Sequence, residues 1–192
     1  MTALYPVFLK LDGLPVVVVG GGPVAASKLE GLLVAGARVT VIAPQVVDAI
    51  RAHESVAILE TEFCPAHLHG ARWVVAAATP DVNRDVAVAA AARGLFVNAV
   101  DEPANASAYL GGVVRRGEVE ISISTGGTAP ALAGLLREAL DAILPHDLEK
   151  WIAVAAVARR EWRRDGIAMA ERRPMLMRAL DRLYRPKAQV PS

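Results

Sequence analysis

Three segments of the sequence combine residue types that can bind or react with a small molecule. One is the glycine pattern Gly20-x-Gly22-x-x-Ala25, the second is the carboxylate Asp101, and the third is Ser124-Thr125-Gly126-Gly127-Thr128. A glycine turn at a helix start presents N–H groups to a phosphate, and a well-placed carboxylate accepts a proton. Hydroxyls and exposed N–H groups before a helix suit a carboxylate or phosphate. These segments indicate an anionic ligand and proton transfer.

The glycine pattern lies where dinucleotide binding requires it. The apolar run Pro15–Val19 predicts a buried strand directly before it, and helical spacing follows from Val24 to Ala35. Gly20 permits the tight turn, and Gly22 has no Cβ to block a pyrophosphate. The context therefore predicts a dinucleotide site rather than a glycine turn that only connects strand to helix.

The residues that would hold the ribose are less typical. The next predicted strand, 38–43, ends in Ala43-Pro44-Gln45, with neither the acid common in NAD sites nor a base for a 2′-phosphate. Gln45 and backbone groups would have to hold the ribose, and these residues leave the choice between NAD and NADP open. We expect the following cofactor-binding residues: Gly20, Gly21, Gly22, Pro23, Val24, Pro44, Gln45 and Thr79.

Alternating strands and helices must position these residues. A helix is predicted at 46–53, an edge strand at 56–60, an apolar strand at 73–78, an Ala-rich helix at 82–93 and a strand at 95–100. This alternation predicts an α/β fold with a Rossmann-type doubly wound parallel sheet. Asp101 then follows the last of these strands, at the sheet edge where such folds bind ligands.

The pattern changes beyond Asp101. Strands are predicted at 109–115 and 119–124, and a helix runs from Thr128-Ala129-Pro130 to near Pro145. Helices at 147–164 and 168–184 follow. We therefore expect a Rossmann domain (1–110), a small α+β segment (111–145) and a basic C-terminal helical appendage (146–192).

Composition excludes several classes of function. Aromatic residues make up 5% of the chain, which does not favour a stacking surface for nucleic acid. Apolar runs are short and the N-terminus has no basic leader pattern, so neither a membrane span nor a signal peptide is expected. Cys64 is the single cysteine, which agrees with a cytoplasmic location. Residues 146–192 contain 11 Lys and Arg against 6 Asp and Glu. These cationic side chains either form a solvated helix face or bind a polyanionic substrate.

Several motifs occur together and in one order. They are VGGGPVAASK at 19–28, GARVTVIAP at 36–44, NAVD at 98–101 and ISISTGGTAPAL at 121–132. In combination they resemble the precorrin-2 dehydrogenase and sirohydrochlorin ferrochelatase family, over roughly residues 4–165. The sequence departs from the family pattern at two places. Ser27 precedes Lys28 where the family usually has Arg, and Ala108-x-x-Gly111 replaces Phe-x-x-Pro, so the exact substrate stays open.

The resemblance implies an enzyme of tetrapyrrole biosynthesis. It implies NAD-dependent oxidation of precorrin-2 to sirohydrochlorin by a homodimer, with 111–145 as the central dimerisation segment and Asp101 as the catalytic carboxylate. Thr125 occupies a position where some members carry a phosphorylatable serine, and whether it is modified is open. We expect the substrate-binding residues to be Asn98, Ser124, Thr125, Gly126 and Arg115.

Alternatives remain at this stage. The chain could be a ferrochelatase, alone or in addition, or an NAD-sensing module that contacts a partner through the basic helices. Cys64-x-x-His67-x-His69 is an incomplete ligand set, so no metal site is expected. The 192 residues contain no methyltransferase module, so we expect methylation to come from another protein.

Overall fold

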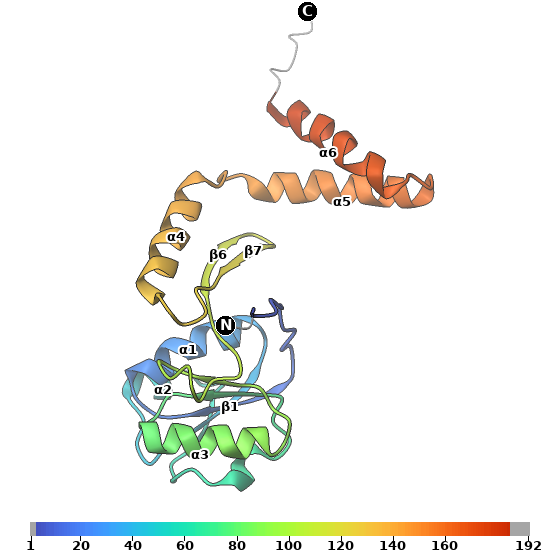
Figure 1. The fold of residues 1–192 in the computed structure, drawn as a ribbon. Helices are drawn as coiled ribbons and strands as arrows, with labels where there is room; N and C mark the ends of the chain where they lie inside the picture. Colours follow the sequence, from blue (N-terminus) through green and yellow to red (C-terminus); the bar gives the residue numbers. More distant parts are fainter. Residues whose placement is uncertain (1–2, 185–192) are drawn as a thin grey trace, which may run out of the picture. The chain divides into compact units, whose positions relative to one another are not determined.

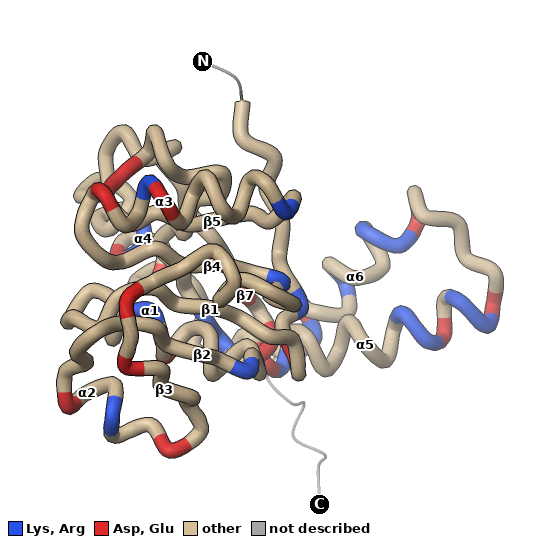
Figure 2. The backbone as a smooth tube through the Cα atoms, turned by 90° about the horizontal axis from the view of Figure 1, so that it is seen from below, with Lys and Arg blue, Asp and Glu red and all other residues tan. Residues whose placement is uncertain are grey.

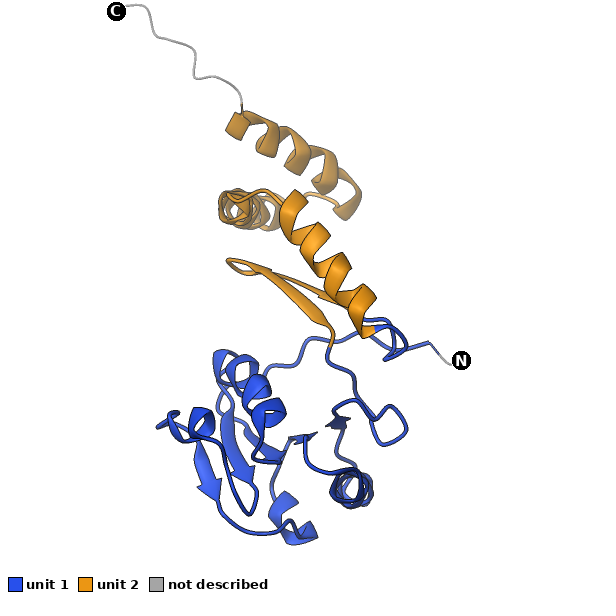
Figure 3. Ribbon diagram, turned by 90° about the vertical axis from the view of Figure 1, so that its left-hand side faces the viewer, with its two compact units in different colours: residues 1–110, 124–129 blue, residues 111–123, 130–192 orange. Residues whose placement is uncertain are grey.

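A computed structural model describes residues 3–184 of the chain. The chain forms two compact units, which Figure 3 colours separately. Within the described residues, unit 1 contains 3–110 and 124–129, and unit 2 contains 111–123 and 130–184. The segment 124–129 therefore packs with the N-terminal unit although it follows the hairpin of unit 2.

Unit 1 is built on a parallel sheet of five strands in the order β3-β2-β1-β4-β5. The strands are β1 (Pro15–Val19), β2 (Arg38–Ile42), β3 (Ala57–Leu59), β4 (Trp73–Ala76) and β5 (Val97–Ala99). The order runs outward from β1 in both directions, which is the arrangement of a doubly wound fold. The predicted α/β fold class and the predicted edge strand are confirmed.

Helices cover both faces of this sheet (Figure 1). Val16 and Val18 of β1 pack in the core that contains α1 (Pro23–Val34), whereas Val17 and Val19 pack with α3 (Pro80–Ala91). Alternate residues of a strand point to opposite faces, so a strand covered on both sides must be apolar throughout. This explains the unbroken valine run that leads into the glycine turn.

Several element ends differ from the sequence prediction. The helix expected over 46–53 is the single turn α2 (Asp48–Arg51), and the strand expected over 95–100 is the three-residue β5. A 3₁₀ helix, η1 (Pro65–Leu68), was not predicted. Each difference lies at an end of the sheet or in a loop, where tertiary contacts decide the backbone path.

The described part of unit 2 contains a hairpin and three helices. β6 (Gly112–Arg116) and β7 (Val119–Ile123) pair antiparallel, and α4 (Pro130–Ile143) packs on β6. Arg116 of β6 forms an ion pair with Asp141 of α4, with 2.8 Å between Nη2 and Oδ1. The predicted hairpin and helix are thus joined by a polar contact as well as by apolar packing.

The helices α5 (Leu148–Arg164) and α6 (Met169–Tyr184) pack on each other and carry many cationic side chains (Figure 2). The indole N–H of Trp151 donates to the Tyr184 hydroxyl, which in turn donates to Asp147 Oδ1 at 3.2 Å. These bonds join the end of α6 to the beginning of α5. No helix within residues 3–184 is both long and apolar enough to span a membrane.

Candidate functional site

The C-terminal ends of the parallel strands lie at one edge of the unit 1 sheet. Val19 pairs with Ala76, and Ala76 pairs with Ala99, so β1, β4 and β5 end at the same level. The strand order reverses between β1 and β4, and ligands of open α/β folds bind at this reversal. Adjacent strands are about 4.8 Å apart. The segments after β1, β4 and β5 can therefore contact one small molecule.

The glycines after β1 have distinct structural roles. Gly20 has a φ of 127°, which side chains rarely permit, and a Cβ at Gly20 would overlap the Ala77 carbonyl oxygen. A Cβ at Gly21 would overlap the backbone of Gln45, whereas one at Gly22 would meet no protein atom within 4 Å. The fold therefore explains Gly20 and Gly21, and the space at Gly22 fits a ligand that approaches the backbone.

The start of α1 leaves donors for an anion. Gly22 is the N-cap and Pro23 takes the first helical position, where its missing N–H costs nothing. Within the described residues, the N–H groups of Val24 and Ala25 donate to no backbone or side-chain acceptor, and the first intrahelical bond runs from Ala26 to Gly22. Such free N–H groups at a helix start favour phosphate. The glycine turn therefore fits the pyrophosphate of a dinucleotide.

The segment that follows β2 lies beside the glycine turn. The Val47 N–H donates to the Gly21 carbonyl at 2.9 Å, which holds the segment 43–47 against the glycine turn. The exposed side chain of Gln45 lies in this segment. The prediction that Gln45 borders the cofactor site therefore has a geometric basis, but its contact with a ribose stays a prediction.

Arg51 of α2 and Glu60, which follows β3, form an ion pair with each other. Arg51 Nη1 donates to Glu60 Oε1 at 2.8 Å. This hydrogen bond, together with the positive charge of Arg51, lowers the pKa of the Glu60 carboxyl. The same bond, together with the negative charge of Glu60, raises the pKa of Arg51. Arg51 is therefore occupied by Glu60, and segment 43–47 contains no cationic residue to receive a 2′-phosphate.

Asp101 lies in the turn that follows β5. Its φ of 58° is left-handed, and among the described residues no other non-glycine residue has a positive φ. Asp and Asn adopt this conformation more readily than other side chains do. The carboxylate is exposed and makes no side-chain hydrogen bond within residues 3–184. It is therefore free to accept a proton from a bound molecule.

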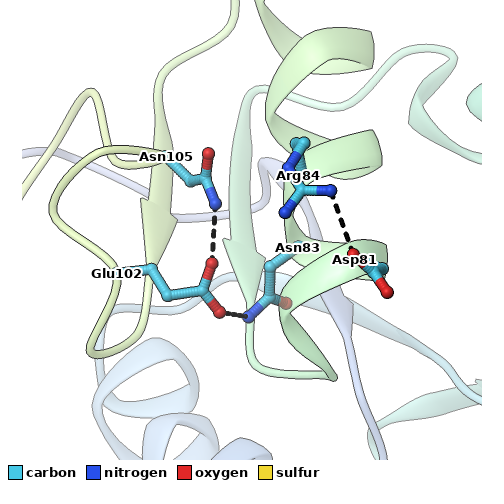
Figure 4. A network of polar contacts seen from close by, with 5 residues as sticks. All are labelled: Asp81, Asn83, Arg84, Glu102 and Asn105. Carbon is cyan, nitrogen blue, oxygen red and sulfur yellow. Dashed lines mark hydrogen bonds and ion pairs between the residues drawn. The ribbon is translucent and has the colours of Figure 1, made fainter.

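The acid beside Asp101 is engaged in a network of side-chain amides (Figure 4). Asn83 of α3 donates from Nδ2 to Glu102 Oε1 at 2.7 Å, and Asn105 donates from Nδ2 to Glu102 Oε2 at 2.6 Å. The Asn83 side chain also bonds both the N–H and the carbonyl of Ala78. The sequence patterns did not predict Asn83, Glu102 or Asn105 as site residues.

Asn98 has a structural contact instead of a free amide. It is 6% exposed in β5, and its Nδ2 donates to the Ala108 carbonyl at 3.1 Å. The Ala108 N–H donates to Val97 at 3.0 Å. Both the N–H and the carbonyl of Ala108 are thus hydrogen-bonded to β5. These bonds attach the loop that begins the Ala108-x-x-Gly111 departure from the family pattern. A contact of Asn98 with substrate stays a prediction.

The hydroxyl segment 124–128 packs beside the loop that follows Asp101. A Cβ at Gly127 would lie 3.2 Å from the Tyr109 ring and 3.4 Å from Pro103, and all three residues belong to unit 1. Ser124 Oγ accepts the Gly126 N–H at 3.1 Å, and Thr125 Oγ1 accepts the Ala129 N–H at 3.3 Å. Both hydroxyls thereby cap the loop and keep their own hydrogens for donation.

Arg115, predicted to bind substrate, and His67, of the incomplete ligand set, both have hydrogen-bond partners within the protein. Arg115 belongs to β6 of unit 2, and its Nε donates to Glu120 at 2.7 Å, so a substrate contact stays a prediction. His67 Nδ1 accepts the Cys64 N–H at 3.1 Å and caps η1. In residues 3–184 no group of three or more His, Cys, Asp or Glu side chains is arranged to hold a metal ion.

The sheet order, the glycine turn and the free donors at the start of α1 define a dinucleotide-binding Rossmann protein. Comparison with known proteins narrows this class. The chain belongs to the family described as putative NAD(P)-binding, whose sequence model matches residues 7–112. Thr79, Asp101 and the glycine turn all lie within the matched range.

The chain is also similar to siroheme synthases, as the motifs indicated. It is 42% identical over 185 residues to siroheme synthase 1 of Aeromonas salmonicida, which covers 93% of this chain and 39% of that protein. It is 40% identical over 148 residues to a siroheme synthase of Neisseria meningitidis serogroup C, which covers 75% of this chain and 31% of that protein. The chain thus spans about two fifths of the length of the first of these relatives.

A solved structure shares the fold of the chain. The protein described as SirC, precorrin-2 dehydrogenase, matches with a TM-score of 0.72 and 24% sequence identity. The match covers 96% of this chain and 94% of that chain. It supports the parallel sheet and the helical C-terminal region alike.

Proposed function

We propose that this chain oxidises precorrin-2 to sirohydrochlorin with NAD as the hydride acceptor. The observation that carries the proposal is the free carboxylate of Asp101 at the same sheet edge as the glycine turn. The names of the relatives, siroheme synthase and precorrin-2 dehydrogenase, supply the tetrapyrrole substrate class.

The residues divide the reaction between them. The N–H groups at the start of α1 hold the pyrophosphate, and Gln45 borders the ribose. When bound, NAD supplies the electron acceptor of the reaction. Oxidation also releases a proton, which Asp101 accepts, and the hydroxyls of Ser124 and Thr125 donate to substrate carboxylates.

An anaerobic assay tests this function. Purified protein is mixed with precorrin-2 and NAD, and the absorbance of NADH and sirohydrochlorin is followed. Asp101→Asn keeps the shape and the left-handed turn but removes the base, so we expect turnover to fall by about 10²- to 10⁴-fold. Asp85→Asn, at an exposed position of α3, is the control and should retain activity. Absence of turnover in the wild type with both NAD and NADP would refute the proposal.

Iron insertion is a second candidate, because the same carboxylate could accept the pyrrole protons of sirohydrochlorin during metal uptake. Anaerobic incubation of sirohydrochlorin with Fe²⁺, without NAD, separates this reaction from dehydrogenation. Metal insertion faster than the protein-free rate, and slowed in Asp101→Asn, supports it. Binding of NAD with neither reaction would instead favour a redox-sensing module.

We further propose that the chain forms a homodimer through segment 111–145, with 146–192 as a basic helical appendage. The support is α4, on which Leu132, Leu135, Leu136 and Ile143 are exposed. An exposed apolar face of this kind marks an interaction surface. Sedimentation of the wild type should give a dimer, and Leu135→Lys should shift it toward monomer. The cytoplasmic location also stays a prediction.

A further inference from the structure

Two adjacent acids follow β5, and the structure gives them different surroundings. Asp101 is exposed and makes no side-chain hydrogen bond within the described residues, whereas both oxygens of Glu102 accept amide hydrogens. An ionised carboxylate accepts hydrogen bonds and donates none, so two amide donors suit it. Glu102 is therefore a poor candidate for proton transfer and a good candidate for an anchor.

The donors of Glu102 are themselves fixed. Asn83 is 1% exposed, and its Oδ1 accepts the Ala78 N–H at 2.9 Å. Since a backbone N–H can only donate, this bond sets the orientation of the amide and directs Nδ2 toward Glu102. Asn83 thereby links the segment after β4 to the segment after β5.

The left-handed turn at Asp101 requires stabilising contacts from its surroundings. A left-handed conformation costs a non-glycine residue free energy, and it persists where the surroundings determine it. On the N-terminal side of Asp101, the Val100 N–H donates to the Ala76 carbonyl. On the C-terminal side, the side chain of Glu102 is held by Asn83. The Asn105 N–H also bonds to the Glu102 carbonyl at 3.0 Å.

We propose that Glu102 is a positioning residue whose carboxylate, held by Asn83 and Asn105, fixes the left-handed turn that presents Asp101. The same contact couples this turn to the Ala78–Thr79 segment of the cofactor site. That Asp101 is the base rests on the proposed function, but the hold on the turn does not.

Exchange of one hydrogen-bond partner tests the network. Glu102→Gln replaces one carboxylate oxygen with an NH₂ group, so in either amide orientation one Asn donor meets another donor. The double variant Glu102→Gln with Asn105→Asp reverses the direction of one bond, restores both bonds and keeps the net charge of the wild type. Glu62→Gln, at an exposed position of unit 1, is the matched control.

Amide hydrogen exchange measured peptide by peptide gives a readout that needs no substrate. In Glu102→Gln we expect exchange across 100–108 to accelerate roughly tenfold or more, because a hydrogen bond to a charged group is lost. Exchange in β1 and α1 should stay unchanged. The double variant should return to the wild-type rate, and Glu62→Gln should not differ from it.

The assay of precorrin-2 oxidation adds a second readout. Glu102→Gln should lower kcat while leaving the KM for NAD within about twofold, and the double variant should recover kcat. Unchanged exchange in Glu102→Gln, or failure of the double variant to restore exchange, would overturn the positioning role. A wild type without turnover would refute the proposed function alone, because the exchange result stands independently.

Discussion

The backbone of Gln45 lies against Gly21, so closely that a methyl group at position 21 would overlap the Gln45 carbonyl oxygen. This contact brings the end of β2 to the glycine turn after β1. It gives adjacent glycines different constraints, since position 21 faces protein and position 22 faces open space. Substitutions can therefore separate folding from ligand binding.

Gly21→Ala should affect the stability of the fold, whereas Gly22→Ala should affect the binding of NAD. We expect Gly21→Ala to reduce the free energy of unfolding by about 1–3 kcal/mol, because the added methyl forces the β2 loop away. Gly22→Ala should change it by less than about 1 kcal/mol, since Gly22 has an ordinary extended backbone at the N-cap.

Binding of NAD is measured on the same two proteins by calorimetry. Gly22→Ala should weaken it by roughly tenfold or more, because its methyl occupies the space that a pyrophosphate needs. Wild-type affinity in Gly22→Ala would contradict a pyrophosphate at this turn.

The left-handed turn at Asp101 predicts an order of stability that is independent of activity. Glycine adopts a positive φ readily, so Asp101→Gly removes the backbone strain at this position. Alanine adopts a positive φ less readily than aspartate, so Asp101→Ala keeps the strain. We expect the glycine variant to be more stable than the alanine variant by about 1 kcal/mol. Urea unfolding monitors this difference, and equal midpoints would show that the turn relaxes in solution.

The Arg51–Glu60 pair should influence stability at acidic pH. The hydrogen bond from Arg51 lowers the folded-state pKa of the Glu60 carboxyl, so the pair stabilises the fold above the ordinary glutamate pKa. This contribution is lost as the pH falls through the lowered pKa. In an NMR titration, Arg51→Gln should move the Glu60 pKa up toward its ordinary value, and added salt should weaken the shift in the wild type. An unchanged titration in Arg51→Gln would exclude the pair in solution.

The hydroxyl of Tyr184 should hold the two C-terminal helices together. Tyr184→Phe removes the acceptor of the Trp151 indole and the donor to Asp147, so we expect a loss of about 1 kcal/mol in the packing of α5 on α6. The indole N–H signal of Trp151, assigned by Trp151→Phe, should shift in the NMR spectrum of Tyr184→Phe. Tyr109→Phe is the control, because its hydroxyl bonds within unit 1. An unmoved Trp151 signal would contradict the contact.

The end of β2 should control the choice of cofactor. Gln45→Glu places a negative charge where the sequence has none, and this charge repels a 2′-phosphate more than a ribose hydroxyl. We expect the ratio of NAD to NADP affinity to rise by about tenfold or more. Gln45→Asn is the neutral control. An unchanged ratio in Gln45→Glu would place the ribose away from this residue.

The amino-acid sequence by itself determined the local features of this protein. Valines before the glycine turn, proline at the start of α1 and the 3.6-residue spacing of α4 identify strand, turn and helix, because these patterns depend on neighbouring residues. The same patterns put Asp101 after a strand, and the combined motifs indicated the relatives that the comparisons report. Only tertiary structure decided which strands are adjacent and which distant side chains meet.

The remaining features depend on contacts between residues far apart in the chain. Asn83 and Glu102 are 19 residues apart and meet because β4 and β5 are neighbours in the sheet. Asn98, predicted to bind substrate, donates its amide hydrogen to the Ala108 carbonyl, since a buried polar group requires a partner, and its contact with substrate stays a prediction. The left-handed turn at Asp101 has no sequence signal beyond the tolerance of aspartate for it. Periodicity shows which elements form, whereas the packing of the sheet decides which polar groups it leaves free for chemistry.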